Sequence, residues 1–159
     1  MTEKLELRMY GLVPYNISPI QQGIQYGHAV VEYTNKYFGD EEYQKWSKVD
    51  KTFIILNGGT TNNNESQLGT MNQYLQTLVD NEIKIETFHE PDLGNQLTAI
   101  VFLVDERVFN RIKYPDFETS VLGALNTWKY KREYKGWIKK IGGEKNVFLR
   151  DFLKNFRLA

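Results

Sequence analysis

The apolar run LTAIVFLVD at residues 97–105 places the strongest constraint on the fold. A strand that is apolar on both faces must be covered on both faces, which is typical of a central strand in a helix-covered sheet. A second buried strand is predicted at residues 51–57, and two further strands at residues 5–13 and 82–90. The chain therefore needs helices to cover the sheet.

Helical patterns separate these strands. The first helix is predicted over residues 18–38, with Ser18 as its N-cap and Pro19 in its first turn. Shorter helices are expected at residues 41–49, 67–81, 106–112, 118–131 and 147–157. Strands separated by helices favour parallel pairing. We therefore expect an α/β fold with a small sheet covered by helices.

The composition excludes several kinds of protein. The chain has 159 residues, which suits one domain with a substantial core. It has no cysteine, so it has no disulfide and no thiolate ligand, and its two histidines make an all-histidine metal site improbable. We expect neither a metal nor another cofactor. No apolar run approaches the ~18 residues of a membrane span, and the N-terminus lacks a signal sequence, so we expect a cytoplasmic protein.

Charge is unevenly distributed although the net charge is zero. Residues 128–159 hold 10 Lys and Arg against 3 Asp and Glu, interleaved with aromatic residues. Such a tail is able to contact a phosphate backbone. It is equally able to pack as an amphipathic extension on an acidic body, either its own or that of a second subunit.

The first helix carries a polar stripe without charges. Gln21, Gln25 and His28 lie on one side of it, and residues 16–31 contain no Lys, Arg, Asp or Glu. An apolar stripe lies beside them, formed by Ile20, Ile24 and Val31. The pattern predicts a polar surface at the border of the buried face, shaped for a neutral or anionic partner. The alternative is a histidine satisfied by its neighbours, with glutamines at a solvent edge.

The segment at residues 88–98 is the second candidate. It contains Glu90, Asp92, Asn95 and Gln96 between two predicted strands. An acid here could hold a histidine in one tautomer or act as a base. The alternative is a tight hairpin whose Asp, Gly and Asn residues only form the turn.

The third candidate is the loop NGGTTNNN at residues 57–64, which follows a buried strand and precedes a helix. Ligands often bind at this position in α/β sheets. The candidates to hold a phosphate are Asn57, the amides of Gly58 and Gly59, and the hydroxyls of Thr60 and Thr61. The loop lacks the Lys-Ser/Thr pair of a nucleoside-triphosphate-binding P-loop.

Together, these segments resemble the type II peptidyl-tRNA hydrolases. The resemblance covers residues 9–105 and rests on the blocks RMYGLVPY, GIQYGHAVVEY, KTFIILN and EIKIETFHEPDLGNQLTAIVFLVD. It implies a three-layer α/β domain with a mixed sheet of about four strands. The domain would span residues 1–112, with residues 113–159 as a helical extension packed on it. The chain is also similar to bacteriophage-encoded relatives of this fold.

The resemblance assigns individual residues of this chain to the family's site. His28 and Gln25 match the family's helix His and Gln, and Asp92 matches the acid of its Asp-x-Gly turn. The family's lysine falls near Gln21, and its threonine after the turn has no clear match, although Gln96 and Thr98 stand nearby. The family's Gly-Pro ending is replaced by VDERVF.

Three functions follow as hypotheses. The first is hydrolysis of an acyl ester of tRNA or of a related substrate, with His28 and Asp92 as catalytic residues and the other candidates binding substrate. The second is capture of a signalling nucleotide without turnover, in a pocket lined by the Gln and His stripe of the first helix, the loop NGGTT and the turn around Asp92, with Glu90, Asn95 and Gln96 beside it. The third is a protein-interaction domain that uses the basic aromatic tail. The expected partners are tRNA or a nucleotide and a second copy in a homodimer, and no membrane.

Overall fold

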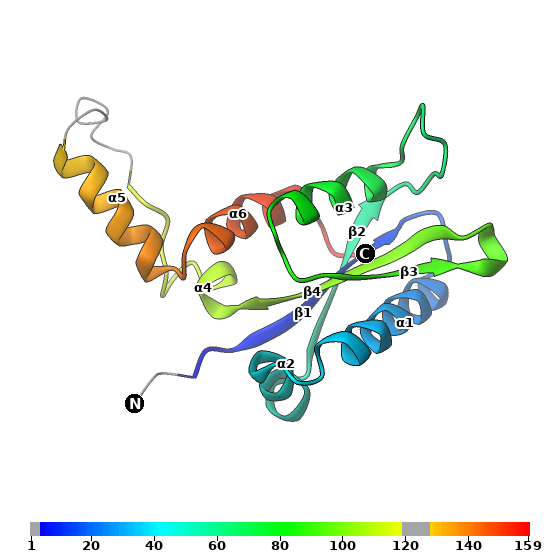
Figure 1. The fold of residues 1–159 in the computed structure, drawn as a ribbon, viewed down its shortest axis with the longest axis horizontal. Helices are drawn as coiled ribbons and strands as arrows, with labels where there is room; N and C mark the ends of the chain where they lie inside the picture. Colours follow the sequence, from blue (N-terminus) through cyan, green and yellow to red (C-terminus); the bar gives the residue numbers. More distant parts are fainter. Residues whose placement is uncertain (1–3, 119–127) are drawn as a thin grey trace.

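The computed structural model describes residues 4–118 and 128–159 and is built on one four-stranded mixed sheet (Figure 1). The strand order is β2-β1-β4-β3; β1 runs parallel to β2, while β4 is antiparallel to both β1 and β3. The four strands are β1 (Leu7–Pro14), β2 (Thr52–Gly59), β3 (Glu86–Glu90) and β4 (Gln96–Asp105). The α/β class and the mixed sheet are confirmed.

β1 and β4 form the centre of the sheet. All of β1 except Arg8 is buried, and residues 97–102 of β4 are buried without interruption. This continuous burial arises because apolar side chains leave both faces of each strand and helices cover both faces. The expectation of a central strand at residues 97–105 is correct.

One face of the sheet is covered by α1 (Pro19–Tyr37) and α2 (Glu41–Lys45), followed by a π-helical turn at Trp46–Asp50. Ser18 caps α1 as expected, because its Oγ accepts a hydrogen bond from the amide of Gln21 at 3.2 Å. The core of this layer is formed by Leu7, Met9, Val13, Tyr26, Ala29, Tyr33, Tyr43, Trp46, Ala99 and Val101.

The opposite face is covered by α3 (Thr70–Asp80) and α6 (Glu144–Phe152). Leu149 and Phe152 of α6 pack with Leu12, Met71 and Phe102 in the second core. The last residues then pair with the outer edge of β2, where the amide of Ala159 donates to the carbonyl of Ile55 at 3.0 Å. The C-terminal segment is therefore part of the core and also covers a sheet edge.

The remaining helices lie at one end of the molecule. α4 (Glu106–Phe109) follows β4 directly, and α5 (Trp128–Lys140) extends away from the sheet (Figure 1). Short 3-10 turns occur at Pro91–Leu93 and Leu153–Asn155. Within the described residues, no helix is long and apolar enough to span a membrane.

Some sequence expectations differ from the structure. Parallel pairing is limited to β1 and β2. β3 and β4 pair antiparallel because the connection at residues 91–95 is far too short for the dozen or more residues of a parallel crossover, and β4 is also antiparallel to β1. The strand expected from residue 82 begins at Glu86, since Glu82 has a left-handed φ of 57°. Most of the helix predicted at residues 118–131 lies outside the described residues, and α6 begins before residue 147.

A close contact between Gly11 and Tyr26 generates a stability prediction. A Cβ at Gly11 would overlap the ring of Tyr26 and approach Val101 to 3.2 Å. We expect Gly11→Ala to lower the free energy of unfolding by about 1–3 kcal/mol, measured by urea denaturation. Gly136→Ala in α5 is the matched control: its Cβ meets nothing within 4 Å, and it should leave stability unchanged or raise it. Equal effects of the two substitutions would contradict this account of the packing.

Candidate functional site

Three segments meet at the end of the sheet where β1 and β2 finish. They are the first turns of α1, the turn between β3 and β4, and the loop between β2 and α3, all at the right-hand side of Figure 1. The loop touches the turn directly, because the Asn63 side chain donates a hydrogen bond to the carbonyl of Gly94 at 3.0 Å. The topology therefore gathers two of the candidate segments around the beginning of α1.

Gln25 is the buried centre of this site, with 2% of its surface exposed. Its Nε2 donates to Glu90 Oε2 at 2.7 Å, and its Oε1 accepts from the hydroxyl of Thr98 at 2.5 Å. A buried amide is costly unless its groups are paired, and these two bonds also fix which end of the amide is the donor. Thr98, Gln25 and Glu90 thus form a hydrogen-bonded chain from the sheet to the surface.

Glu90 is the carboxylate that this chain positions. Its Oε1 accepts a hydrogen bond from the amide of Asp92 at 3.2 Å, and Gln25 binds the other oxygen. The bond from Gln25, then the bond from Asp92, and finally the charge of nearby His28 lower the pKa of Glu90 below its usual value. Glu90 is therefore held as a carboxylate at neutral pH.

His28 lies on the exposed side of α1 and is held by Phe88 of β3. The two rings stack with their centroids 4.4 Å apart and an angle of 17° between their planes. Stacking leaves the edge of the imidazole, with its two nitrogens, available to solvent or to a substrate. A histidine at the surface near a fixed carboxylate has the elements of a general base.

The carboxylate that Gln25 holds, and whose pKa responds to the charge of His28, is that of Glu90. The Asp92 side chain is exposed and makes no hydrogen bond or ion pair to any residue that the structure describes. The turn residue Asn95 adopts a left-handed φ of 58° and donates its amide to the carbonyl of Glu90 at 2.9 Å, while Gln96 pairs with Glu90 across the hairpin. These residues form the turn, as the alternative interpretation of this segment supposed.

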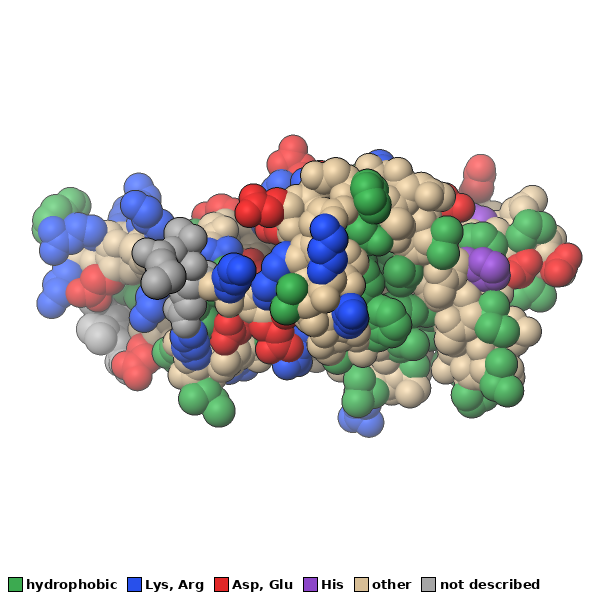
Figure 2. Space-filling view, turned by 90° about the horizontal axis from the view of Figure 1, so that it is seen from below, with side chains coloured by type: hydrophobic (Ala, Val, Ile, Leu, Met, Phe, Trp, Pro, Cys, Tyr) green, Lys and Arg blue, Asp and Glu red, His purple; other side chains and the backbone are tan. Residues whose placement is uncertain are grey.

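The buried side of α1 is not the one that the apolar stripe indicated. Ile20 is 77% exposed, and Ile24 and Val31 are also exposed, whereas the buried residues are Gln25, Tyr26, Ala29 and Tyr33. Figure 2 views the molecule from the side of α1 and shows apolar side chains at the surface.

The size of Tyr26 explains why this side of α1 is the buried one. Its ring packs on the bare backbone of Gly11, and its hydroxyl donates to the carbonyl of Met9 at 2.8 Å. Turning the isoleucines inward would expose two large tyrosines. Gln21 remains exposed at the start of the helix.

The loop at residues 57–64 uses its polar groups internally. The amide of Gly59 donates to Asn57 Oδ1 at 2.8 Å, and Thr60 and Thr70 exchange amide-to-hydroxyl bonds at 2.9 and 3.2 Å. Gly58 and Gly59 are required here because a Cβ at Gly58 would overlap Met71 and Gly59 has a φ of 85°. The amide of Gly59 and the hydroxyl of Thr60, two of the candidate phosphate-binding groups, are therefore engaged within the loop and in joining it to α3.

The candidate residues of that loop do not join the His28 site by any hydrogen bond among the described residues. Asn57 and Gly59 line a separate cavity of about 280 Å³ with Arg157 of the C-terminal segment. Thr61 has a buried hydroxyl without a hydrogen-bond partner in the described part of the chain.

Sequence reasoning missed two residues of the site, Thr98 and Phe88, and only Thr98 had a signal in the sequence. Thr98 is the one polar residue in the apolar stretch at residues 97–104, a position that normally needs a hydrogen-bond partner. Phe88 gave no signal, because an aromatic residue is ordinary in a strand. In residues 4–118 and 128–159, no group of three or more Asp, Glu, His or Cys residues is arranged to hold a metal ion.

Comparison of the chain with protein-family models, with characterised proteins and with solved structures found no match. The site is therefore interpreted from its own geometry.

The buried hydrogen bonds of Gln25 predict that Gln25→Leu lowers the stability of the protein. The substitution removes the donor to Glu90 and the acceptor of the Thr98 hydroxyl, so we expect a loss of about 1–3 kcal/mol in the free energy of unfolding. Gln21→Leu on the exposed side of the same helix should change it by no more than about 0.5 kcal/mol. The contribution of Gln25 is disproved if both variants unfold at the same urea concentration.

The same substitution should change the titration of Glu90. Because the folded state lowers its pKa, Glu90 favours folding above the usual glutamate pKa of about 4.3, and this contribution is lost as the pH falls through the lowered pKa. Gln25→Leu removes the first cause of the shift, so the pKa of Glu90 should rise. Carbon-13 NMR titration of the Glu90 carboxyl would measure it, and an unchanged pKa would mean that Gln25 does not hold the carboxylate.

Proposed function

We propose that the protein hydrolyses an acyl ester of tRNA or of a related substrate, with His28 and Glu90 as its catalytic pair. The supporting observation is the chain from Thr98 through Gln25 to Glu90, which holds a carboxylate near an exposed imidazole. Buried glutamines that serve only packing have no need of a surface carboxylate as a partner. The resemblance of residues 23–33 to the helix of type II peptidyl-tRNA hydrolases supports the same reaction.

In this mechanism His28 acts as the general base. Its neutral imidazole takes a proton from a water molecule as the water oxygen attacks the ester carbonyl carbon. The tetrahedral intermediate then collapses, the bond between the carbonyl carbon and the ribose oxygen breaks, and the imidazolium returns the proton to that oxygen. Glu90, ionised at neutral pH, stabilises the imidazolium by its charge.

The surroundings of His28 suit a large substrate. The side chains of Ile20, Ile24 and Val31 are exposed on α1 and offer apolar contact area for the acyl group. Helix α5 carries six Lys and Arg residues against one Glu at the opposite end of the molecule (Figure 1). An RNA long enough to reach from one end to the other would contact α5 through its phosphates while its acylated end lies at His28. Such a substrate would place the protein in the cytoplasm.

The two other hypotheses have less support. Nucleotide capture relied on the amides of the loop at residues 57–64, of which those of Gly59 and Thr60 are engaged within the protein. A separable interaction tail is difficult to reconcile with Leu149 and Phe152, which are buried in the core. Dimerisation remains a prediction.

The proposal is tested by release of the acyl group from a labelled peptidyl-tRNA. His28→Ala should lower kcat/KM by about 100-fold or more, because it removes the general base, and Glu90→Gln should lower it less. His89→Ala is the matched control. His89 is exposed on β3, so this variant should retain full activity. The hydrolase proposal is rejected if the wild-type protein releases no acyl group, or if His28→Ala and His89→Ala are equally active.

A further inference from the structure

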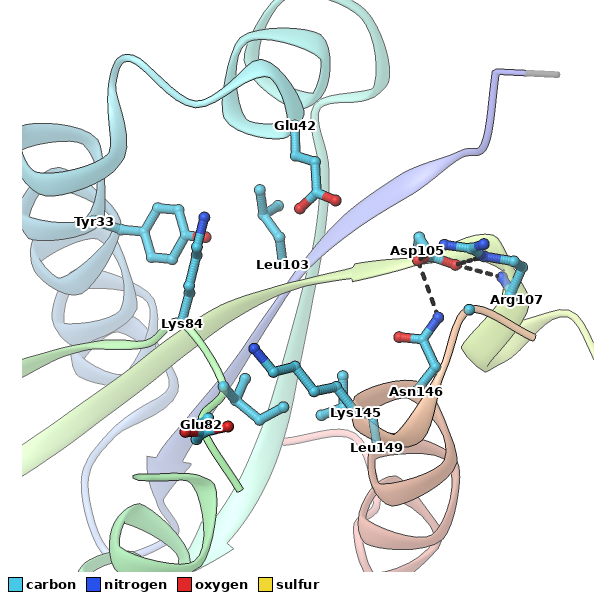
Figure 3. Close-up of a pocket in the computed structure, with 12 residues that line it drawn as sticks. Tyr33, Glu42, Glu82, Lys84, Leu103, Asp105, Arg107, Lys145, Asn146 and Leu149 are labelled. Atoms are coloured by element: carbon cyan, nitrogen blue, oxygen red, sulfur yellow. Dashed lines mark hydrogen bonds and ion pairs between the residues drawn. The ribbon is translucent and has the colours of Figure 1, made fainter. Parts of the chain in front are cut away.

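A second cavity lies at the other end of the sheet, where β4 ends, and shares no residue with the His28 site (Figure 3). It has a volume of about 290 Å³. Its walls come from α1, α2, the segment before β3, the end of β4 and the first turn of α6. The residues that the argument uses are Tyr33, Glu42, Leu103, Lys145 and Asn146.

Two buried polar groups are presented to this cavity. Asn146 is 9% exposed, and its Nδ2 donates to Asp105 Oδ2 at 3.1 Å and to the carbonyl of Ile141 at 2.7 Å. These bonds fix the amide so that its oxygen is left as an acceptor. Tyr33 is 2% exposed, and its hydroxyl makes no hydrogen bond within the described residues. Figure 3 shows the Asn146 oxygen and the Tyr33 hydroxyl directed toward the space between them.

The two groups are available to a ligand because neither the Asn146 oxygen nor the Tyr33 hydroxyl makes a hydrogen bond within the described residues. Both residues line the cavity, so a molecule that enters it can replace solvent at these two atoms with its own hydrogen bonds. A bound molecule with both N–H donors and acceptor oxygens would satisfy the amide oxygen of Asn146 and the phenol of Tyr33 together.

The charges at the cavity are partly compensated. Arg107 is paired with Asp105 at 2.9 Å, and Lys84 is paired with Asp40 at 2.8 Å. The ammonium of Lys145 makes no ion pair within the described part of the chain, and the same is true of the carboxylate of Glu42. In Figure 3 these two side chains extend from opposite walls, with Leu103 between them.

From this arrangement we propose that the cavity binds a small zwitterion of the α-amino acid class. The ligand carboxylate would bind Lys145 and the ligand ammonium would bind Glu42, while the Tyr33 hydroxyl and the Asn146 oxygen are available to its remaining hydrogen-bonding groups. The ligand side chain would pack on Leu103.

The size and charge of the cavity favour this class over a nucleotide. Drug-sized ligands usually occupy about 300–1,000 Å³, so 290 Å³ lies at the small end. Glu82 adds a second unpaired carboxylate to the wall, which disfavours a phosphate group with two negative charges. A molecule with one negative and one positive group matches the ammonium of Lys145 and the carboxylates of Glu42 and Glu82 better than a dianion does.

The first experiment uses the full chain and the twenty common L-amino acids in a thermal-shift assay. At least one should raise the Tm by about 2 °C or more at saturating concentration. The amine that lacks its carboxylate, and the N-acetyl derivative that lacks its ammonium, should each give no shift. The proposal is overturned if no amino acid raises the Tm, or if either analogue raises it as much as the parent compound.

The second experiment identifies the cavity as the binding site. Lys145→Gln and Glu42→Gln should each weaken binding of the active amino acid by about tenfold or more in calorimetry, because each removes a charge-assisted contact. Lys139→Gln and Glu41→Gln are matched controls: both residues are exposed and neither lines the cavity, so binding should be unchanged. Equal weakening by the control variants would place the ligand elsewhere. Because the test measures binding alone, it is independent of the esterase proposal.

Discussion

The contact between Tyr26 and the bare backbone of Gly11 determines how α1 lies on the sheet. An aromatic ring of this size needs a position without a Cβ beneath it, and the strand provides that position at its buried centre. The hydroxyl of Tyr26 is satisfied by the carbonyl of Met9, so the ring enters the core without an unpaired polar atom. Once this side of the helix faces inward, Gln25 must lie over Thr98 and His28 must lie against Phe88.

The orientation of α1 converts a helix of weak amphipathic character into one side of a site. Gln25 is buried because it is next to Tyr26, and it is tolerated because both ends of its amide are hydrogen-bonded. The chain of bonds ends at Glu90, where the hairpin turn also supplies an amide from Asp92. A packing contact in the core thus sets the position of a carboxylate at the surface, and the bond from Gln25 lowers the pKa of that carboxylate.

The two ends of the sheet carry different chemistry for a topological reason. The end near His28 collects the connections around the hairpin of β3 and β4, which bring an acid close to the helix. The opposite end collects the end of β4 and the first turn of α6, so that Asn146 binds Asp105 and Lys145 lies beside a cavity. The sheet separates the two sites, so the proposed ester hydrolysis and the proposed binding of a small zwitterion would not share residues.

Several features could be predicted from sequence because they depend on local chemistry. Ser18 and Pro19 begin a helix since one caps its amides and the other needs no hydrogen-bond donor. The run at residues 97–105 forms a central strand since apolar side chains on both of its faces must be covered. His28 and Gln25 were evident as polar groups in an otherwise uncharged segment.

The rest depended on contacts between residues far apart in the chain. Glu90 and Asp92 are both acids in one turn, and only the position of Gln25, 65 residues away, selects Glu90 as the partner of the site. The hydroxyl of Thr60, a candidate to hold a phosphate, accepts a hydrogen bond from the amide of Thr70 in the next helix. The sequence by itself determined the class of fold, its central strand and the polar character of α1. The tertiary structure alone decided which side of α1 is buried and which acid is held, because helical periodicity does not reveal which side chain fits over Gly11.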